Sequence, residues 1–423
     1  MKKGSLAQYF EGVAAKRLSA VEADRITSRQ HEFNGVVGLR QLLAEPDGKS
    51  RYTTKFLYVT DDEGQPLIED GFLTWYDSRQ KGRLERGVQR SEYRLYFPTN
   101  RVSQCARTGD LLVIAKRPSG TLLAIVAEQN SSIAQQMVWL FGLSDLDQPD
   151  FFIRDERALQ SEKVELASRL ILDSIGVVVE ETADTYLEAL LHKFGGGFPP
   201  TREFSAYARS TLRHVKAQEG PDEALMAWMD REEILFRTLE RHLVVERLKT
   251  GFGEDVDSFM SFSLSVQNRR KSRAGLALEN HLSLLFTEFG INHARAAVTE
   301  NRSKPDFLFP GRAEYLDPRL DASKLTMLGC KSTCKDRWRQ ILAEAARIET
   351  KHLLTLEAAI SVNQTNEMRA HKVHLIVPSE LHASYAPSER AWLMNVADLV
   401  ALLLDKQQIS TARNRVRSAA QPL

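Results

Sequence analysis

Apolar and polar residues form short, partly alternating runs in the first third of the chain, a pattern typical of β-strands. These runs cover residues 55–60, 93–97, 111–115 and 122–126. Turn-forming residues, for example Gly and Pro within 62–66, separate the runs. Many short strands at this spacing predict a barrel or a sandwich.

From about residue 156 the apolar positions take helical spacing and charged residues become more frequent. The segment 194–200 contains three glycines and two prolines, which end a helix and permit a hinge. We therefore predict a β-rich domain over residues 1–155, a helical linker over 156–197 and a second domain over 198–423.

The second domain has a mixed α/β pattern, so the whole chain is expected to be an α+β multidomain protein. Predicted helices cover residues 203–216, 222–249, 272–289, 335–349 and 388–406, and Ser272 can cap the third of these. Predicted strands cover residues 306–309, 325–330, 352–355 and 373–377.

Composition adds few constraints. The chain has 423 residues, of which 43% are hydrophobic and 27% charged, values that are ordinary for a soluble globular protein. It has no apolar run of membrane-spanning length and no secretory signal, so we expect no membrane partner. Its three cysteines (Cys105, Cys330 and Cys334) make a disulfide framework or a zinc site improbable. These features favour a cytoplasmic location.

Charge is distributed unevenly along the chain, although the net charge is only +1. Residues 79–107 contain eight basic side chains and two acidic ones, and residues 269–273 form a second basic cluster. Surfaces that bind phosphate need such a local excess. Either cluster taken alone is more simply explained as a solvated charged face.

A candidate nuclease site lies in the second domain. Asp306 opens one predicted strand, Lys331 ends the next, and Glu344 follows thirteen residues later. Hydrolysis of a phosphodiester needs carboxylates that hold a divalent metal, usually Mg²⁺, and a lysine can orient the attacking water or stabilise the developing charge. Glu279, on the preceding predicted helix, is a fourth candidate.

This pattern departs from the usual one, which has an acidic residue two positions before the lysine. That position is Gly329, so Glu344 would have to supply the second carboxylate. Four residues after Lys331, the triplet Lys335-Asp336-Arg337 begins; it carries donors for guanine and an acceptor for cytosine. The same triplet also suits the N-terminus of a helix, where Asp336 would stabilise the first turn.

Several blocks of the C-terminal half resemble EcoRII-type restriction endonucleases. They are Ser265–Gly275, Lys304–Pro310, Lys331–Leu342 and Val377–His382. The resemblance implies a restriction-endonuclease-like (PD-(D/E)XK) domain with a central mixed sheet, in which the second carboxylate lies on the helix. It implies that Asp306, Lys331 and Glu344 are catalytic, with Glu279 as a supporting acid. Asp306 and Glu344 would hold the metal. Lys335, Asp336 and Arg337 would read a CC:GG edge of the DNA.

The resemblance further implies a dimeric catalytic domain that uses Mg²⁺ and no nucleotide cofactor. Double-stranded DNA would be cut at a CC-N-GG-type site such as CCWGG, leaving 5′-phosphate ends with five-base overhangs. Some relatives extrude central bases into a pocket. Arg231 and Phe236 fall in the corresponding helix, where core packing of Phe236 is the alternative.

The N-terminal domain resembles the effector domain of the same family, a β-pseudobarrel that binds a further DNA site and restrains the nuclease. Its expected DNA-binding residues are Lys16, Arg17, Arg79, Lys81, Arg83, Glu85 and Arg86. Two other functions remain open at this stage: a non-cleaving DNA-binding regulator and a repair or junction-resolving nuclease on the same core.

Overall fold

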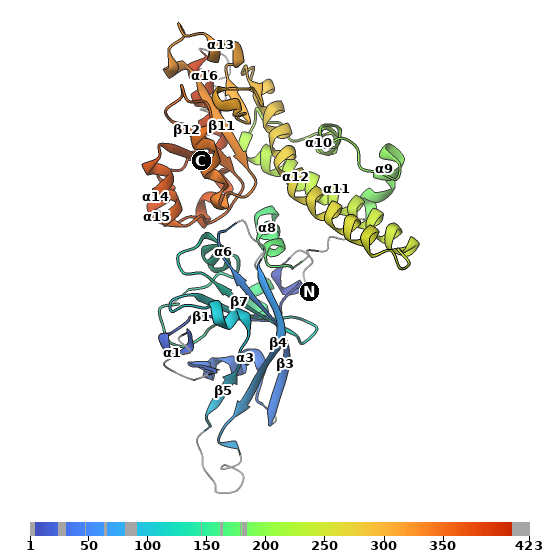
Figure 1. The fold of residues 1–423 in the computed structure, drawn as a ribbon, viewed down its shortest axis with the longest axis vertical. Coiled ribbons are helices and arrows are strands. Elements are labelled where there is room, and N and C mark those ends of the chain that lie inside the picture. Colours follow the sequence, from blue (N-terminus) through green and yellow to red (C-terminus); the bar gives the residue numbers. More distant parts are fainter. Residues whose placement is uncertain are drawn as a thin grey trace. The chain divides into compact units, whose positions relative to one another are not determined.

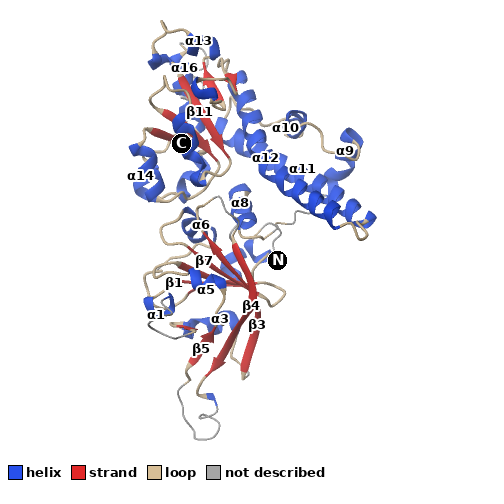
Figure 2. Ribbon diagram, in the orientation of Figure 1, coloured by secondary structure: helices blue, strands red, loops and turns tan. Residues whose placement is uncertain are grey.

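The computed structural model describes residues 5–407 except 24–30, 47, 63–65, 81–90, 145, 161–163, 178 and 180–183, and it gives the backbone alone at 184, 185, 271, 335 and 336. The chain forms two compact units, one of residues 1–179 with 359–364 and one of residues 180–358 with 365–423. Each unit has a β-sheet of its own (Figures 1 and 2).

The first unit is built on an eight-stranded sheet with the order β2-β5-β4-β3-β7-β6-β1-β8. Its strands are β1 (Gly12–Arg17), β2 (Glu32–Phe33), β3 (Lys49–Val59), β4 (Leu67–Asp77), β5 (Tyr93–Tyr96), β6 (Leu111–Lys116), β7 (Leu122–Ala127) and β8 (Phe152–Asp155). Only the β3–β7 pair is parallel. The four predicted strands of this region are confirmed as β3, β5, β6 and β7.

This sheet curls until its two edges approach each other. Phe33 on β2 packs edge-on against Phe151 beside β8, with ring centroids 6.4 Å apart, and the Phe151 N–H donates to the Gly35 carbonyl (3.2 Å). Gly35 has φ = 68°, and a Cβ there would lie 2.4 Å from the Pro149 carbonyl oxygen, so the close approach requires glycine. The β-pseudobarrel itself stays a prediction.

Short helices surround this sheet: η1 (Leu6–Gln8), α1 (Ala20–Ala23), η2 (Val36–Leu39), α3 (Arg40–Leu43), α5 (Arg101–Cys105), α6 (Ser132–Leu140), α7 (Glu156–Gln160) and α8 (Leu166–Ser174). The apolar face of the sheet buries Phe56, Trp75 and Leu95 in one core. Helices α7 and α8 also belong to this compact unit, beyond residue 155.

The second unit has a five-stranded mixed sheet with the order β13-β12-β11-β10-β9. The strands are β9 (Ala294–Arg295), β10 (Phe307–Phe309), β11 (Thr326–Lys331), β12 (Lys351–Thr355) and β13 (Val373–Ile376). β9, β10 and β11 pair antiparallel, whereas β11, β12 and β13 run parallel. All four strands predicted for this region are confirmed, and β9 is additional.

Among the described residues, four helices of this unit come before its sheet, and they include the two longest. They are α9 (Asp184–Phe194), α10 (Thr201–Ser210), α11 (Pro221–Thr250) and α12 (Val256–Glu288). The later helices are η3 (Glu300–Arg302), α13 (Arg312–Leu316), η4 (Ala322–Lys324), η5 (Lys335–Ala343), α14 (Val362–Ala370), η6 (Ser379–Ser384), α15 (Pro387–Arg390) and α16 (Val396–Lys406). The two long helices α11 and α12 pack against each other (Figure 1).

Four of the five predicted helices differ in extent from the structure. The helix predicted over 203–216 ends, as α10, at Ser210. α12 begins sixteen residues before Ser272, because Asp255 caps it by accepting from the Ser258 N–H at 2.9 Å. The helix predicted over 335–349 is a 3₁₀ helix that ends at Ala343. The helix predicted over 388–406 is divided into α15 and α16, since Asn395 makes a capping box that starts a new helix.

Helix α12 packs against the sheet through Phe286. Its ring meets those of Phe307 and Phe309 on β10 nearly at right angles, with centroids 5.3 and 5.0 Å away. Such edge-to-face contacts add to the burial of apolar surface in fixing the packing. Because Glu279 lies about two turns before Phe286, the same packing brings it toward the start of β10.

Candidate active site

Asp306 and Lys331 meet at the end of the antiparallel β10–β11 pair. Asp306 directly precedes β10, whose Phe307 pairs with Leu328 of β11, and Lys331 is the last residue of β11. The Asp306 Oδ2 atom accepts a hydrogen bond from the Cys330 N–H at 2.6 Å and lies 3.4 Å from the Lys331 Nζ. The pairing predicted from the sequence is therefore present in the structure.

Glu344 reaches this site from the end of η5 rather than from within a helix. It is the C-cap residue of η5 and has an extended conformation. The helix packs closely on β11 at Gly329, where a Cβ would lie only 2.6 Å from Ile341 Cγ2. The lack of a side chain at Gly329 thus lets η5 approach the sheet closely enough to deliver Glu344.

Electrostatic interactions tie Glu344 to the other two groups. The pKa of Glu344 is raised to about 7, chiefly by burial and also by the charge of Asp306, while Lys331 and Lys351 lower it. Its Oε2 atom is buried and has no hydrogen-bond partner among the described residues. Asp306 therefore disfavours the ionised form of Glu344, and Lys331 favours it.

A buried lysine that the sequence analysis missed holds the backbone at Glu344. The Lys351 Nζ, on β12, donates to the carbonyls of Glu344 (2.5 Å) and Ala345 (2.9 Å), and Lys351 is 6% exposed. Ala345 has φ = 47°, so the chain reverses sharply after Glu344. No sequence signal marked Lys351, because its importance depends on a turn that the helix prediction excluded.

A second set of polar contacts lies behind the same turn. Tyr315 is 1% exposed, and its hydroxyl donates to Glu300 Oε2 at 2.5 Å. Glu300 also accepts from the Ala346 N–H (3.3 Å), and the Tyr315 hydroxyl accepts from the Arg347 N–H (3.3 Å). Tyr315 is therefore packed in the interior of the second unit.

Glu279 completes the acidic side of the site. It lies on α12 and accepts from the Arg295 guanidinium on β9 at 2.8 Å. Burial raises its pKa, the Arg295 hydrogen bond lowers it, and the charges of Asp306 and Lys331 both act on it. Glu279 and Glu344 therefore both lie close enough to Asp306 and Lys331 for those charges to act on their pKa values.

The residues fit a divalent cation. The unpartnered buried oxygen of Glu344 and the repulsion between Glu344 and Asp306 are both relieved by a positive ion with oxygen ligands. Across the residues that the structure describes, no group of three or more His, Cys, Asp or Glu side chains is arranged as a metal site. Any metal here would hence take further ligands from water or substrate, as Mg²⁺ commonly does.

The residues expected to read bases lie at the start of η5. Arg337 is half-buried, and its guanidinium donates to the Thr333 carbonyl (3.0 Å) and to Thr333 Oγ1 (2.9 Å). The side chains of Lys335 and Asp336 lie outside the described part of the chain. The hydrogen bonds to Thr333 orient Arg337 before any ligand binds.

Arg231 and Phe236 belong to different surroundings on α11. Phe236 is 2% exposed and stacks on Phe198 at 5.1 Å beside a pocket of about 170 Å³. Arg231 is not among the residues lining that pocket; its guanidinium lies 5.0 Å from the centre of the Tyr186 ring. For Phe236 the structure thus supports the alternative of core packing.

The N-terminal candidates divide into three groups. Lys16 is 2% exposed, and its Nζ contacts Glu22 (2.9 Å) and the Asn34 carbonyl (3.1 Å), so its expected DNA contact is not supported. Arg17 is half-buried and donates to the Gly109 carbonyl at 3.1 Å. The third group, Lys81, Arg83, Glu85 and Arg86, lies outside the described residues.

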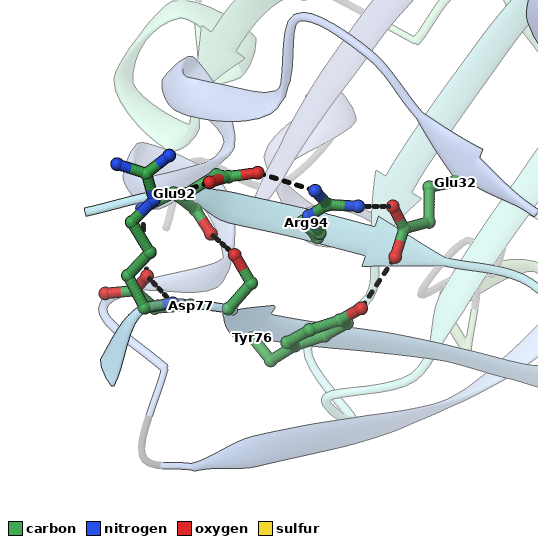
Figure 3. A network of polar contacts seen from close by, with 7 residues as sticks. Glu32, Tyr76, Asp77, Glu92 and Arg94 are labelled. Atoms are coloured by element: carbon green, nitrogen blue, oxygen red, sulfur yellow. Dashed lines mark hydrogen bonds and ion pairs between the residues drawn. The ribbon is translucent and has the colours of Figure 1, made fainter. Parts of the chain in front are cut away.

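A polar network joins β4 and β5 near the end of β4 and the start of β5, the ends that flank residues 81–90 (Figure 3). Glu92 accepts hydrogen bonds from the guanidinium groups of Arg94 (2.5 Å) and Arg79 (2.6 Å). Both hydrogen bonds lower the pKa of Glu92, and the one from Arg94 has the larger effect. Arg94 also pairs with Glu32, which accepts from the Tyr76 hydroxyl at 2.6 Å. Two basic residues of the 79–107 cluster are thereby neutralised locally.

No helix in the described ranges combines the length and the apolar character needed to cross a membrane.

Residues 236–400 match the family model described as EcoRII C terminal. The chain is similar to the type II restriction enzyme EcoRII of Escherichia coli, with 45% identity over 207 residues. That match covers 49% of this chain and 50% of the relative, so the chain spans about half the length of the curated relative it matches.

Two solved structures are distantly similar. Metal-depleted Ecl18kI in complex with uncleaved, modified DNA is 16% identical with a TM-score of 0.44, covering 57% of this chain and 92% of that one. The restriction endonuclease PspGI–substrate DNA complex is 16% identical with a TM-score of 0.43, covering 50% of this chain and 94% of that one.

Proposed function

We propose that this protein is a type II restriction endonuclease that cuts double-stranded DNA at a CC-N-GG-type site such as CCWGG, leaving 5′-phosphate ends. The observation that carries the proposal is the convergence of Asp306, Lys331 and Glu344 within the region that matches the EcoRII C-terminal domain. Glu344 brings an unpartnered buried oxygen to a site that already holds a paired acid and lysine.

In this mechanism Asp306 and Glu344 hold the metal, which we propose is Mg²⁺. When bound, the ion supplies Lewis-acid polarisation of the phosphate and lowers the pKa of a bound water. The Lys331 ammonium, 3.4 Å from Asp306, orients the attacking water and balances charge on the phosphate in the transition state. Glu279 supports the site from α12 and stays tied to Arg295.

Digestion of a plasmid of known sequence with and without Mg²⁺ tests the proposal. Discrete fragments that end at one sequence, lost in EDTA and in Asp306→Ala or Lys331→Ala, are the expected result. Site-specific binding without cleavage would instead support a DNA-binding regulator. Nicking that depends on junctions or damage would support a repair nuclease. Full cleavage by Asp306→Ala would refute the site.

Sequence readout is proposed for Lys335, Asp336 and Arg337. A bidentate arginine contact to guanine contributes about 1–3 kcal/mol of discrimination. Arg337→Ala is therefore expected to weaken binding to the specific duplex by that amount and to leave binding to unrelated DNA nearly unchanged. An equal loss on both duplexes, measured by fluorescence anisotropy with Ca²⁺, would contradict base reading by Arg337.

The N-terminal unit is proposed to bind a further copy of the site through Arg17, Arg79, Lys81, Arg83, Glu85 and Arg86, and to restrain cleavage until it does so. Restraint of this kind lowers the population of the competent state until DNA binding shifts the equilibrium. Cleavage of a two-site plasmid should then be faster than cleavage of a one-site plasmid. Equal rates would contradict the restraint.

We also propose that the catalytic domain forms a homodimer. Helices α11 and α12 expose large apolar side chains where they meet, and exposed apolar patches of this kind are common at interfaces. These side chains are Val245, Leu248, Val256, Phe259, Met260 and Leu264. Light scattering during gel filtration should give twice the chain mass for the wild type and less for Phe259→Lys.

A further inference from the structure

A pocket of about 340 Å³ lies between α10, α12 and β9, and its walls are basic and polar. It is lined by Arg202, Arg209, Asn280, Ser283, Leu284, Thr287 and Arg295. None of these lining residues is acidic, and three of them are arginines. We refer to it as the arginine pocket.

Arg209 lies in this pocket and has no direct carboxylate partner among the residues that the structure describes. Within the described residues its side chain contacts His281, with Nη1 2.8 Å from Nδ1. His281 is fully buried, burial lowers its pKa, and its Nε2 lies 2.9 Å from Glu232. Since the arginine must donate, Nδ1 is the acceptor and the proton of the ring is on Nε2.

The nearest negative charges compensate Arg209 only from a distance. Burial lowers the pKa of Arg209, and the charges of Glu232 and Glu288 oppose that effect without contacting the guanidinium. Arg202 is exposed and has no ion pair among the described residues. Two guanidinium groups therefore have unused donors at one pocket, an arrangement suited to an anion with several oxygens.

Arg295 connects the arginine pocket to the candidate active site. Its Nη1 donates to Asn280 Oδ1 and its Nη2 to Glu279 Oε2, both at 2.8 Å. Glu279 in turn feels the charges of Asp306 and Lys331. An anion in the pocket would thus share Arg295 with the supporting acid of the nuclease site.

We propose that the arginine pocket binds one phosphate group of the DNA backbone, a phosphate other than the one that is cleaved. The inference rests on the proposed function and deepens it. A phosphodiester, whose single negative charge is shared by two non-bridging oxygens, can accept hydrogen bonds from the guanidinium groups of Arg202 and Arg209. Binding there positions the duplex relative to Glu279 through Arg295.

The test compares the wild type with Arg202→Gln and with Arg202→Gln/Arg209→Gln. Binding to specific and unrelated duplexes is measured against salt concentration, with Ca²⁺ in place of Mg²⁺. Loss of one phosphate contact should reduce the slope of log K against log salt by about one and weaken both duplexes similarly. Arg319→Gln, at an exposed residue already paired with Asp317, is the control and should leave the slope unchanged.

Three outcomes would overturn the proposal: an unchanged slope in both variants, a slope change equal to that of Arg319→Gln, or stabilisation by inorganic phosphate with an unchanged DNA slope. The last result would identify a site for free phosphate. The single variant alters an exposed residue, so its melting curve should match the wild type. The two proposals fail in different measurements. If only the pocket proposal is wrong, the salt slope does not change as expected but the wild type still cleaves plasmid. If the proposed function is wrong, the wild type does not cleave plasmid, whatever the salt slope is.

Discussion

Replacing Glu344 by glutamine should make the metal-free protein more stable while abolishing cleavage. Glu344 is ionised in the unfolded chain above its ordinary pKa of 4.5, whereas in the folded protein its pKa is raised to about 7. The ionised form therefore disfavours folding. The penalty is absent below pH 4.5, grows as the pH rises, and is complete above pH 7. Glutamine keeps the shape and removes the charge.

The difference between a pKa of 4.5 and about 7 corresponds to roughly 3.4 kcal/mol. Because the carboxyl group is partly accessible to solvent, screening reduces the expected gain to about 1–2 kcal/mol. In a unit of this size each kcal/mol raises the Tm by about 2–4 °C. The gain should be present at pH 8 in EDTA and should vanish near pH 4.5.

Calorimetry in EDTA at pH 8 and pH 4.5 measures this effect, and Glu314→Gln on α13 serves as the control because its side chain is exposed. A second measurement adds Mg²⁺ at pH 8, which should stabilise the wild type more than Glu344→Gln. A Glu344→Gln variant that is no more stable than the wild type at pH 8, or equally stabilised at pH 4.5, would refute this reasoning.

Three further outcomes are expected. Gly329→Ala places a Cβ 2.6 Å from Ile341 Cγ2 and should destabilise the second unit by about 1–3 kcal/mol and slow cleavage, as read from urea titrations and plasmid assays. Gly329→Ala/Ile341→Leu, which removes the Cγ2 methyl, should recover part of both. Lys16→Met removes the opposite charge beside the buried Glu22 carboxylate and should cost the first unit about 3–5 kcal/mol in urea titrations, whereas Lys55→Met, at an exposed pair, should change little. A fragment starting near Pro199 should cut one-site DNA faster than the full chain, and equal rates in a time course would exclude restraint by the N-terminal unit.

Much of the second unit follows from local sequence. Its strands are short apolar runs, and Asp306 and Lys331 stand at strand ends where antiparallel neighbours meet. The residues that orient Glu344 could not be predicted from local sequence. Lys351 acts through a backbone reversal at Ala345, and neither hydrophobic periodicity nor a motif reports which carbonyls a distant lysine will reach.

Other errors have equally specific causes. The start of α12 depended on Asp255, a cap that the apolar spacing after Ser272 concealed. Lys16 was expected to contact DNA because of the resemblance to the effector domain, yet a carboxylate on α1 provides it with a buried partner. Contacts between different elements, rather than residue type, decided both the burial of Lys16 and the arrangement around Glu344.

The contact between Gly329 and Ile341 has a consequence for how such a site changes over evolutionary time. An acidic side chain at 329 and the close approach of η5 exclude each other, so the second carboxylate occupies one position or the other. A single substitution of Gly329 by an acid would displace η5 before the new carboxylate could replace Glu344. Descendants of this chain are therefore expected to keep the glycine and the distant acid together, and loss of either should accompany loss of cleavage.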